Sequence, residues 1–434
     1  MITNMLSKAW ATAFPIAIIT VMTVRPALAA VPSATTELEA FVQEARASNP
    51  GIAAARRRWE AARIRVHGEG LLPDPMLSAS FMNLARLQGP QLTASQAIPL
   101  GGKLDLVRAQ AEREAEVARL AYLSEVSRVV TAVKTAYFDL YALHRQAAVV
   151  SQTKELMTRM SRLAAAKYAV GTVKQGDPLR ANVQVGEMLH EAVLLVQRTD
   201  AAAARLRGLV NRQRVPEGHA GHVKLAASIL LTDALPAPPS FDPALAAAEA
   251  HNPAIGEAKA MLASGEAALA LARTSAIPDL NAQVGVGRAF MDMGWETTLS
   301  GMVGVNVPFP NGQARREAAT QAAVAIVEAR RLELEDRRRG VRVGLEETLG
   351  HLKHLAEQLR LYRRGILPQA RQALQAELAG YQTGRSDFDA WLAAQVNLYR
   401  YEREAYDAFA NYHKMRAELD ALTGAAVADL QEAR

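Results

Sequence analysis

The chain has 434 residues, a formal net charge of +6 and no cysteine. The lack of cysteine excludes a disulfide framework and a lipid anchor on an N-terminal cysteine. Acidic and basic residues are interleaved along the chain, which is typical of solvated helix faces and argues against a nucleic-acid-binding patch.

The first 29 residues have the pattern of a cleavable secretion signal. Lys8 precedes an uncharged apolar run from Ala9 to Val24, and Ala27-Leu28-Ala29 supplies the small residues of a cleavage site. A membrane anchor is the alternative, but the run contains Pro15 and is too short to span a bilayer comfortably. We therefore expect residues 1–29 to be a signal peptide that is removed on export.

The rest of the sequence repeats itself roughly 205 residues later, as one large duplication rather than a solenoid of short units. "NPGIAAARRRWEAAR" at Asn49 is echoed by "NPAIGEAKAMLASGE" at Asn252, an offset of 203 residues. The offset reaches 213 between Gly171 and Gly384, as small insertions within the unit would produce. The expected organisation is a first repeat over 30–211, a connector over 212–242, a second repeat over 243–424 and a tail over 425–434.

Each repeat is expected to contain a helix, a strand pair, a very long helix, a glycine turn and a returning helix. The long helix of the first repeat contains no proline, and about 65 residues at 1.5 Å per residue span roughly 100 Å. Asp177 is expected to cap the returning helix that follows. The first repeat is thus a helix from Glu37 to about Gly70 interrupted at Asn49-Pro50, strands over 75–98, a helix over 103–168 and a helix over 177–211.

The second repeat has the same order of elements. Its long helix is expected to kink between Gly365 and Pro368, and Asp387 is the expected N-cap of its returning helix. Its strands are expected over 279–307, its long helix over 313–379 and its returning helix over 387–423.

The strand segments alternate between apolar and small polar residues. Leu280, Ala282, Val284 and Val286 alternate with Asn281, Gln283, Gly285 and Gly287, over a length that suits a tilted strand in a bilayer. An ordinary half-buried hairpin would give the same alternation. Four strands cannot close a membrane barrel, but three chains would supply twelve strands around a polar lumen. We therefore expect an α+β membrane protein that works as a homotrimer.

At this point the sequence resembles the TolC family of trimeric outer-membrane efflux proteins. The residues that carry the resemblance are the two Asn-Pro helix starts, two strand-to-helix junctions and two helix hairpins. The junctions are "IPLGGKLDLVRAQAE" and "VPFPNGQARREAA"; the hairpins are "KYAVGTVKQGDPLRANVQV" and "GYQTGRSDFDAWLAAQVNLYR".

The resemblance implies a TolC-like homotrimeric channel. A 12-stranded β-barrel in the outer membrane of a Gram-negative bacterium, in contact with outer-membrane lipid, would continue into a 12-helix periplasmic α-barrel. Such a protein is a passive exit duct that receives its substrate from a periplasmic adaptor and an inner-membrane pump of the RND type. "MDMGWETTLSGMVGVNVPF" and "ASQAIPLGGKL" are most similar to members that serve heavy-metal cation pumps.

In that family the glycine turns form the periplasmic tip, which docks the adaptor and narrows to a gate. Tyr381 matches a tyrosine of the gate, and Asp387 and Asp389 lie close to the acidic positions that ring it, where Ala390 and Ala393 stand instead. The carried-over docking residues are Tyr168, Val170, Gly171 and Thr172 in the first turn, and Thr383, Gly384 and Arg385 in the second.

Other sites are weaker or absent. His351 and His354 share a helix face and His219 and His222 lie in the connector, but no nearby carboxylate or thiol completes a metal site. Met291 and Met293 are assigned to a loop between strands. The sequence has no nucleotide-binding loop and no catalytic motif, so we expect neither enzyme activity nor a cofactor.

Several functions remain open beside metal efflux. The same duct could serve drug efflux or type I secretion, because substrate choice lies with the pump. A soluble periplasmic coiled-coil adaptor or scaffold would share the long hairpins but would not explain the strands or the duplication.

Overall fold

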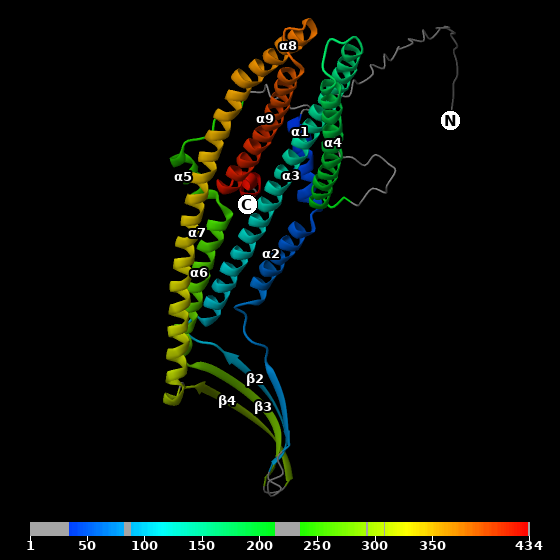
Figure 1. Ribbon diagram of the computed structural model, residues 1–434. Coiled ribbons are helices and arrows are strands. Elements are labelled where there is room, and N and C mark those ends of the chain that lie inside the picture. Colours follow the sequence, from blue (N-terminus) through cyan, green and yellow to red (C-terminus); the bar gives the residue numbers. More distant parts are fainter. Residues whose placement is uncertain (1–33, 82–87, 213–234, 292–293, 308, 433–434) are drawn as a thin grey trace, which may run out of the picture.

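The structure, a computed structural model, describes residues 34–81, 88–212, 235–291, 294–307 and 309–432. The expected signal peptide therefore lies outside the described residues. Long helices occupy one end of the molecule and a single four-stranded sheet occupies the other (Figure 1). None of the described helices combines the length and the apolar character needed to cross a membrane.

The second helix of the first repeat begins after Asn49, whose side chain caps it. The Asn49 Oδ1 accepts hydrogen bonds from the amides of Gly51 at 2.9 Å and Ile52 at 3.3 Å, and Pro50 takes the first helical position. The elements of this repeat are α1 (Ala34–Ser48), α2 (Pro50–Gly68), β1 (Met76–Phe81), β2 (Gln88–Ile98), α3 (Lys103–Ala169) and α4 (Gly176–Leu209).

The second repeat uses the same cap, with Asn252 accepting from Ala254 and Ile255. Its strands and helices are α5 (Phe241–His251), α6 (Pro253–Arg273), β3 (Asp279–Met291), β4 (Gly294–Asn306), α7 (Gln313–Leu361), α8 (Leu367–Thr383), α9 (Phe388–Leu422) and α10 (Ala428–Glu432). Short 3-10 turns cover Thr274–Ala276, Pro310–Gly312 and Ala425–Val427, and a π-helical turn, Tyr362–Ile366, joins α7 to α8.

Both cap asparagines also join the two ends of their repeat. The Asn49 Nδ2 donates to the carbonyl of Leu209 at 2.8 Å, and the Asn252 Nδ2 donates to the carbonyl of Leu422 at 2.8 Å. Each cap therefore satisfies free amides at the start of one helix and a free carbonyl at the end of the returning helix.

The elements form a wall that is four elements wide in the sheet, beside the sheet and at the far end of the helices. The sheet order is β1-β2-β3-β4. Helix contacts give the order α2, α3, α6, α7 near the sheet and α4, α3, α9, α8 farther away. First-repeat elements (β1, α2, α4) thus lie along one edge of the wall, and second-repeat elements (β4, α7, α8) lie along the other.

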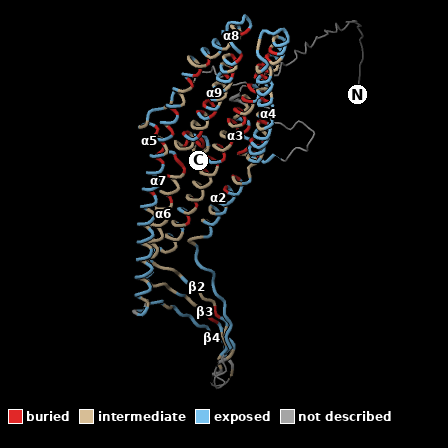
Figure 2. The backbone as a smooth tube through the Cα atoms, in the orientation of Figure 1, coloured by how far each residue is buried: buried red, intermediate tan, exposed pale blue. Residues whose placement is uncertain are grey.

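The strand register separates an apolar face from a polar face. Ala79, Leu92, Val286 and Leu299 form one apolar row across the four strands, and all four are exposed. On the opposite face the rows are Ser78, Thr93, Gly285 and Ser300, and Ser80, Gln91, Gly287 and Thr298. Figure 2 shows that buried residues concentrate in the helical part of the molecule.

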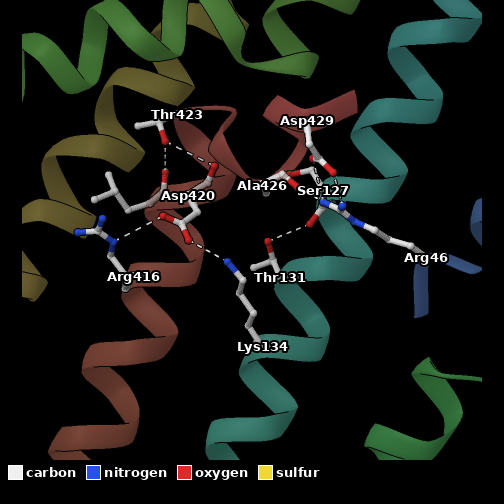
Figure 3. Close-up of polar contacts among 10 residues, drawn as sticks. Arg46, Ser127, Thr131, Lys134, Arg416, Asp420, Thr423, Ala426 and Asp429 are labelled. Carbon is white, nitrogen blue, oxygen red and sulfur yellow. Dashed lines mark hydrogen bonds and ion pairs between the residues drawn. The ribbon is translucent and has the colours of Figure 1, made fainter. Parts of the chain in front are cut away.

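Polar contacts join the two repeats where the chain ends. The Lys134 Nζ of α3 donates to Asp420 of α9 at 2.9 Å, and Arg46 of α1 pairs with Asp429 of α10 at 2.6 Å (Figure 3). Arg46 also donates to the carbonyl of Ala426 at 2.8 Å. The tail is therefore held against the first helix of the chain.

Two expectations differ from the structure. Asp177 is not an N-cap, because α4 already begins at Gly176 and its cap residue Gln175 makes no side-chain hydrogen bond. The long helix of the second repeat does not end at 379, because α8 continues to Thr383. At the position of the expected kink, a π-helical turn joins α7 to α8, and Pro368 lies in the first turn of α8.

Candidate functional site at the tip of the helical hairpins

The end of the wall farthest from the sheet is formed by two helical hairpins: α3–α4, the first hairpin, and α8–α9, the second hairpin (Figure 1). Both reverse at a left-handed glycine, with φ of 73° at Gly171 and 74° at Gly384. The amide of Thr172 donates to the carbonyl of Lys167 at 2.9 Å, and the amide of Arg385 donates to that of Gly380 at 2.8 Å. The duplication has therefore preserved one helix-ending motif at both tips.

The second turn leads into α9 through a side-chain cap. The Asp387 Oδ1 accepts a hydrogen bond from the amide of Ala390 at 2.8 Å, and Asp387 is exposed. In the first hairpin, by contrast, Asp177 is buried in the first turn of α4. The two turns thus share their glycine but not the use of their aspartates.

Tyr381, the predicted gate tyrosine, lies in the apolar core of the tip with only 2% of its surface exposed. Its ring contacts that of Phe388 at 5.7 Å between centroids, and Phe388 contacts Trp391 at 5.5 Å. The other buried members of this cluster come from the first hairpin, so the cluster joins the two hairpins: Met157, Met160 and Ala181.

The Tyr381 hydroxyl is buried and has no hydrogen-bond partner among the described residues. Its burial raises the pKa of the phenol, and the negative charge of Asp177 raises it further. The hydroxyl therefore stays protonated at neutral pH and remains able to donate a hydrogen bond.

Two contacts join the hairpins to each other. The Lys167 Nζ of α3 donates to the carbonyl of Tyr381 at 2.5 Å and lies 4.6 Å from the centre of its ring. Arg180 of α4 forms an ion pair with Asp389 of α9. Asp389 is thus engaged within its own chain, and whether Asp387 and Asp389 also line a pore remains a prediction.

The predicted docking residues differ between the two turns. Tyr168 and Val170 of the first turn are 45% and 74% exposed. Thr383 and Arg385 of the second turn are exposed and polar, and the Thr383 hydroxyl donates to the carbonyl of Ala379 at 3.0 Å. Gly171, Thr172 and Gly384 complete the exposed turns.

Sequence reasoning missed Lys167 and Arg180. Lys167 contacts a backbone carbonyl 214 positions away, and Arg180 pairs with a carboxylate 209 positions away. Neither position stands out in the sequence, because the contacts depend on how the two hairpins pack against each other.

No group of three or more metal-ligating side chains occurs within the described ranges. His351 and His354 are exposed on α7. His219, His222 and Met293 lie outside the described residues, and Met291 is the last residue of β3.

Comparison with known proteins gives a consistent result. The profile of the outer membrane efflux protein family matches twice, over residues 41–212 and 244–425. The cobalt-zinc-cadmium resistance protein CzcC of Cupriavidus metallidurans is 23% identical over 369 residues, which are 84% of this chain and 84% of that protein.

Solved structures share the fold at lower identity. A membrane protein from Pseudomonas aeruginosa superimposes with a TM-score of 0.73 at 17% identity, over 89% of this chain and 93% of that one. The open state of the MtrE outer membrane channel of Neisseria gonorrhoeae gives 0.72 at 16% identity, over 89% and 88%.

Proposed function

The chain belongs to the outer membrane efflux protein family, and we propose that three copies of it form a passive duct across the outer membrane and the periplasm. The observation that carries this proposal is the open wall. In the sheet, beside the sheet and at the tip it has four elements and two free edges, and β1 and β4 both leave backbone groups unpaired. Unpaired edges are not tolerated in lipid, so β4 of one copy must pair with β1 of the next. Three copies then give twelve strands and twelve helices.

The faces of the sheet support a barrel of this kind. Its apolar face is largely exposed, as expected of a surface that contacts lipid. Its polar face carries small uncharged residues along most of its length, which suits the lining of a water-filled channel. A soluble adaptor or scaffold would not need an exposed apolar sheet face, so the sheet disfavours that alternative.

The helices support the same closure. Within the chain, α4 packs mainly on α3 and leaves an exposed apolar ridge on its other side. On the opposite edge, α8 exposes small residues that include Ala373 and Ala376. A ridge of branched side chains can pack into such a surface of the next copy. The ridge consists of Leu179, Val183, Val193 and Val196.

We further propose that the tip docks a periplasmic adaptor, which connects the duct to an inner-membrane pump of the RND type. Tyr168 and Val170 offer exposed apolar contacts for such a partner, and the exposed residues 171, 172, 383, 384 and 385 of the two turns are proposed to contact it as well. Tyr381, Asp387 and Asp389 are proposed as the gate. Residues 1–29 are proposed as the signal peptide, and without a cysteine to carry lipid the barrel alone would anchor the protein.

Heavy-metal cations are the proposed substrate, because the relative named above is described as a cobalt-zinc-cadmium resistance protein. A drug-efflux or type I secretion duct is the alternative. A clean deletion strain, complemented with the intact gene, separates them. Sensitivity confined to metal salts supports the metal assignment, whereas sensitivity to lipophilic drugs and detergents would overturn it and keep the duct.

The gate has its own test. Tyr381→Phe removes the buried hydroxyl without emptying the tip core, and Tyr168→Phe is the matched control in the first turn. In a gate the Tyr381 hydroxyl, which has no partner within the described residues of one chain, would donate to another copy, so we expect single-channel conductance of the purified protein to rise in the Tyr381 variant alone. Equal conductance in all three proteins would remove Tyr381 from the gate.

A further inference from the structure

The apolar face of the sheet contains a shallow cavity of about 280 Å³ near the hairpin ends of the strands. Its apolar lining comes from Ala79 and Phe81 of β1, Leu92 of β2 and Val286 of β3, and the register pairs Ala79 with Leu92 and Leu92 with Val286. Phe81 is 83% exposed, so it stands beside the cavity as a wall. The lining is mainly apolar, with Gln91, Arg288 and Thr297 as its polar members, and its apolar part suits a segment of hydrocarbon chain.

Arg288 lies at the rim of this cavity. Strand alternation places it on the same face as Val284 and Val286. Only two other charged residues occur in the described parts of the four strands, Asp279 and Glu296, and alternation places both on the polar face. Arg288 is therefore the one charge that the described strands direct to the apolar face.

No carboxylate of the described residues forms an ion pair with Arg288, whose side chain is exposed. Its strand partner is Thr297, and the next pair toward the helices is Gly287 with Thr298. An arginine on a lipid-facing surface costs about 2–4 kcal/mol at the middle of a bilayer and about 0–1 kcal/mol near its boundary. A position close to the strand turns is thus one where an arginine can be retained.

β1 and β3 end, and β2 and β4 begin, at the end of the sheet opposite the helices (Figure 1). If the helices extend into the periplasm, this end lies in the outer leaflet of the outer membrane. The outer leaflet consists of a phosphorylated glucosamine disaccharide with several acyl chains. An acyl chain matches the cavity, and a phosphate matches the forked donors of a guanidinium group.

We propose that this cavity and Arg288 form a binding site for the phosphorylated glycolipid of the outer leaflet. One acyl chain lies against Ala79, Leu92 and Val286, and the phosphate accepts hydrogen bonds from the Arg288 guanidinium. The site would hold one lipid per chain. This inference rests on the proposed function, because it requires the sheet to be inserted in the outer membrane.

The test is a lipid titration of the purified protein followed by native mass spectrometry. The probe is bisphosphorylated lipid A, and the variant is Arg288→Gln, with Arg338→Gln on exposed α7 as the matched control. Because a basic side chain contributes about 1 kcal/mol to binding at an anionic membrane surface, we expect the Kd to rise about fivefold in the Arg288 variant only. A phosphate-free lipid A derivative should bind the wild type and the Arg288 variant equally.

Three results would overturn the site. They are an unchanged Kd in Arg288→Gln, an equal loss in Arg338→Gln, and an Arg288 effect that persists with the phosphate-free derivative. Phosphatidylglycerol that binds as tightly as lipid A and with the same dependence on Arg288 would replace the glycolipid by a phospholipid. The same spectra report the number of chains, so failure of the trimer is read separately from failure of the lipid site.

Discussion

The two hairpin tips have the same backbone turn but place their aligned tyrosines in opposite environments. Tyr168 is 45% exposed, whereas Tyr381, at the same position before the glycine, is 2% exposed. Gly171 and Gly384 have nearly identical φ angles. Duplication has therefore preserved the residue that sets the turn, while the side chains around it have diverged into an exposed surface and a packed core.

The surroundings of the hairpins differ in the same way. The returning helix α4 packs mainly on α3, whereas its counterpart α9 packs on α3, α7 and α8. A π-helical turn, Tyr362–Ile366, also precedes the second hairpin, and there the Tyr362 hydroxyl donates to Glu404 at 2.7 Å. A turn of this kind accommodates an extra residue within a helix. The first hairpin has one continuous helix over Lys103–Ala169 instead.

The largest expected effect contrasts the two tyrosines. Replacing a large buried aromatic side chain by alanine costs about 3–5 kcal/mol, so Tyr381→Ala should speed amide exchange around the second turn by at least about 100-fold. Tyr168→Ala removes an exposed side chain and should change exchange less than about threefold. Hydrogen exchange of both variants measures this, and similar effects at the two positions would remove the distinction between the tips.

A second prediction uses pH to compare the returning helices. His413 of α9 lies between Phe138, at 4.5 Å between ring centres, and Phe409, at 4.6 Å. Burial lowers its pKa to about 4, and the charge of Arg416 contributes in the same direction. Because this value lies below that of an unfolded histidine, the unfolded chain binds more protons below pH 6.5.

The stability that neutral His413 contributes is therefore fully present above pH 6.5 and decreases as the pH falls toward 4. Below pH 4 the titration of His413 lowers the stability no further. The partly exposed ring limits the loss to about 2 kcal/mol. His413→Phe should flatten the dependence of the melting temperature on pH between 7 and 5. His190→Gln, at an exposed position of α4, is the control and should leave the slope of the wild type unchanged.

A third prediction tests what the tips have in common. Both glycines have open space where a Cβ would be placed, so Gly171→Ala and Gly384→Ala are strained only through their backbone angles. Each should cost about 1 kcal/mol, and the two costs should agree. Exchange rates of the amides in each turn provide the comparison. A cost confined to one tip would show that the turns are not equivalent.

The smallest expected effect concerns the ion pair between the hairpins. Arg180 and Asp389 are both about half exposed, so Arg180→Gln should destabilise the tip by less than about 1 kcal/mol. The effect should disappear in high salt, because solvent-exposed pairs are screened. An effect of Arg180→Gln that is independent of salt would assign the residue a packing role instead.

The sequence predicted local features of the molecule better than contacts between distant parts of the chain. The fold class is confirmed by the family match and the solved structures. It could be predicted because the period-two strands and the long helices are local patterns. The two Asn-Pro starts could be identified because a cap and its helix are adjacent in sequence. Their contacts to Leu209 and Leu422 could not, because these partners lie 160 and 170 positions away.

The tip was predicted less completely. The glycine turns follow from sequence, since a left-handed residue after a helix favours glycine. The burial of Tyr381 and the exposure of Tyr168 depend on which helices surround each hairpin, and two aligned tyrosines give no sign of it. The wrong prediction for Asp177 has the same origin. Asp177 resembles Asp387 in sequence, but it lies inside α4, whereas Asp387 lies directly before α9.

The central claim is that the open wall of one chain is closed by two further copies. Native mass spectrometry of the protein extracted from outer membranes in mild detergent tests it most directly. We predict a single assembly with three times the mass of the mature chain. A monomer or dimer that persists across detergents and concentrations would contradict the twelve-stranded duct.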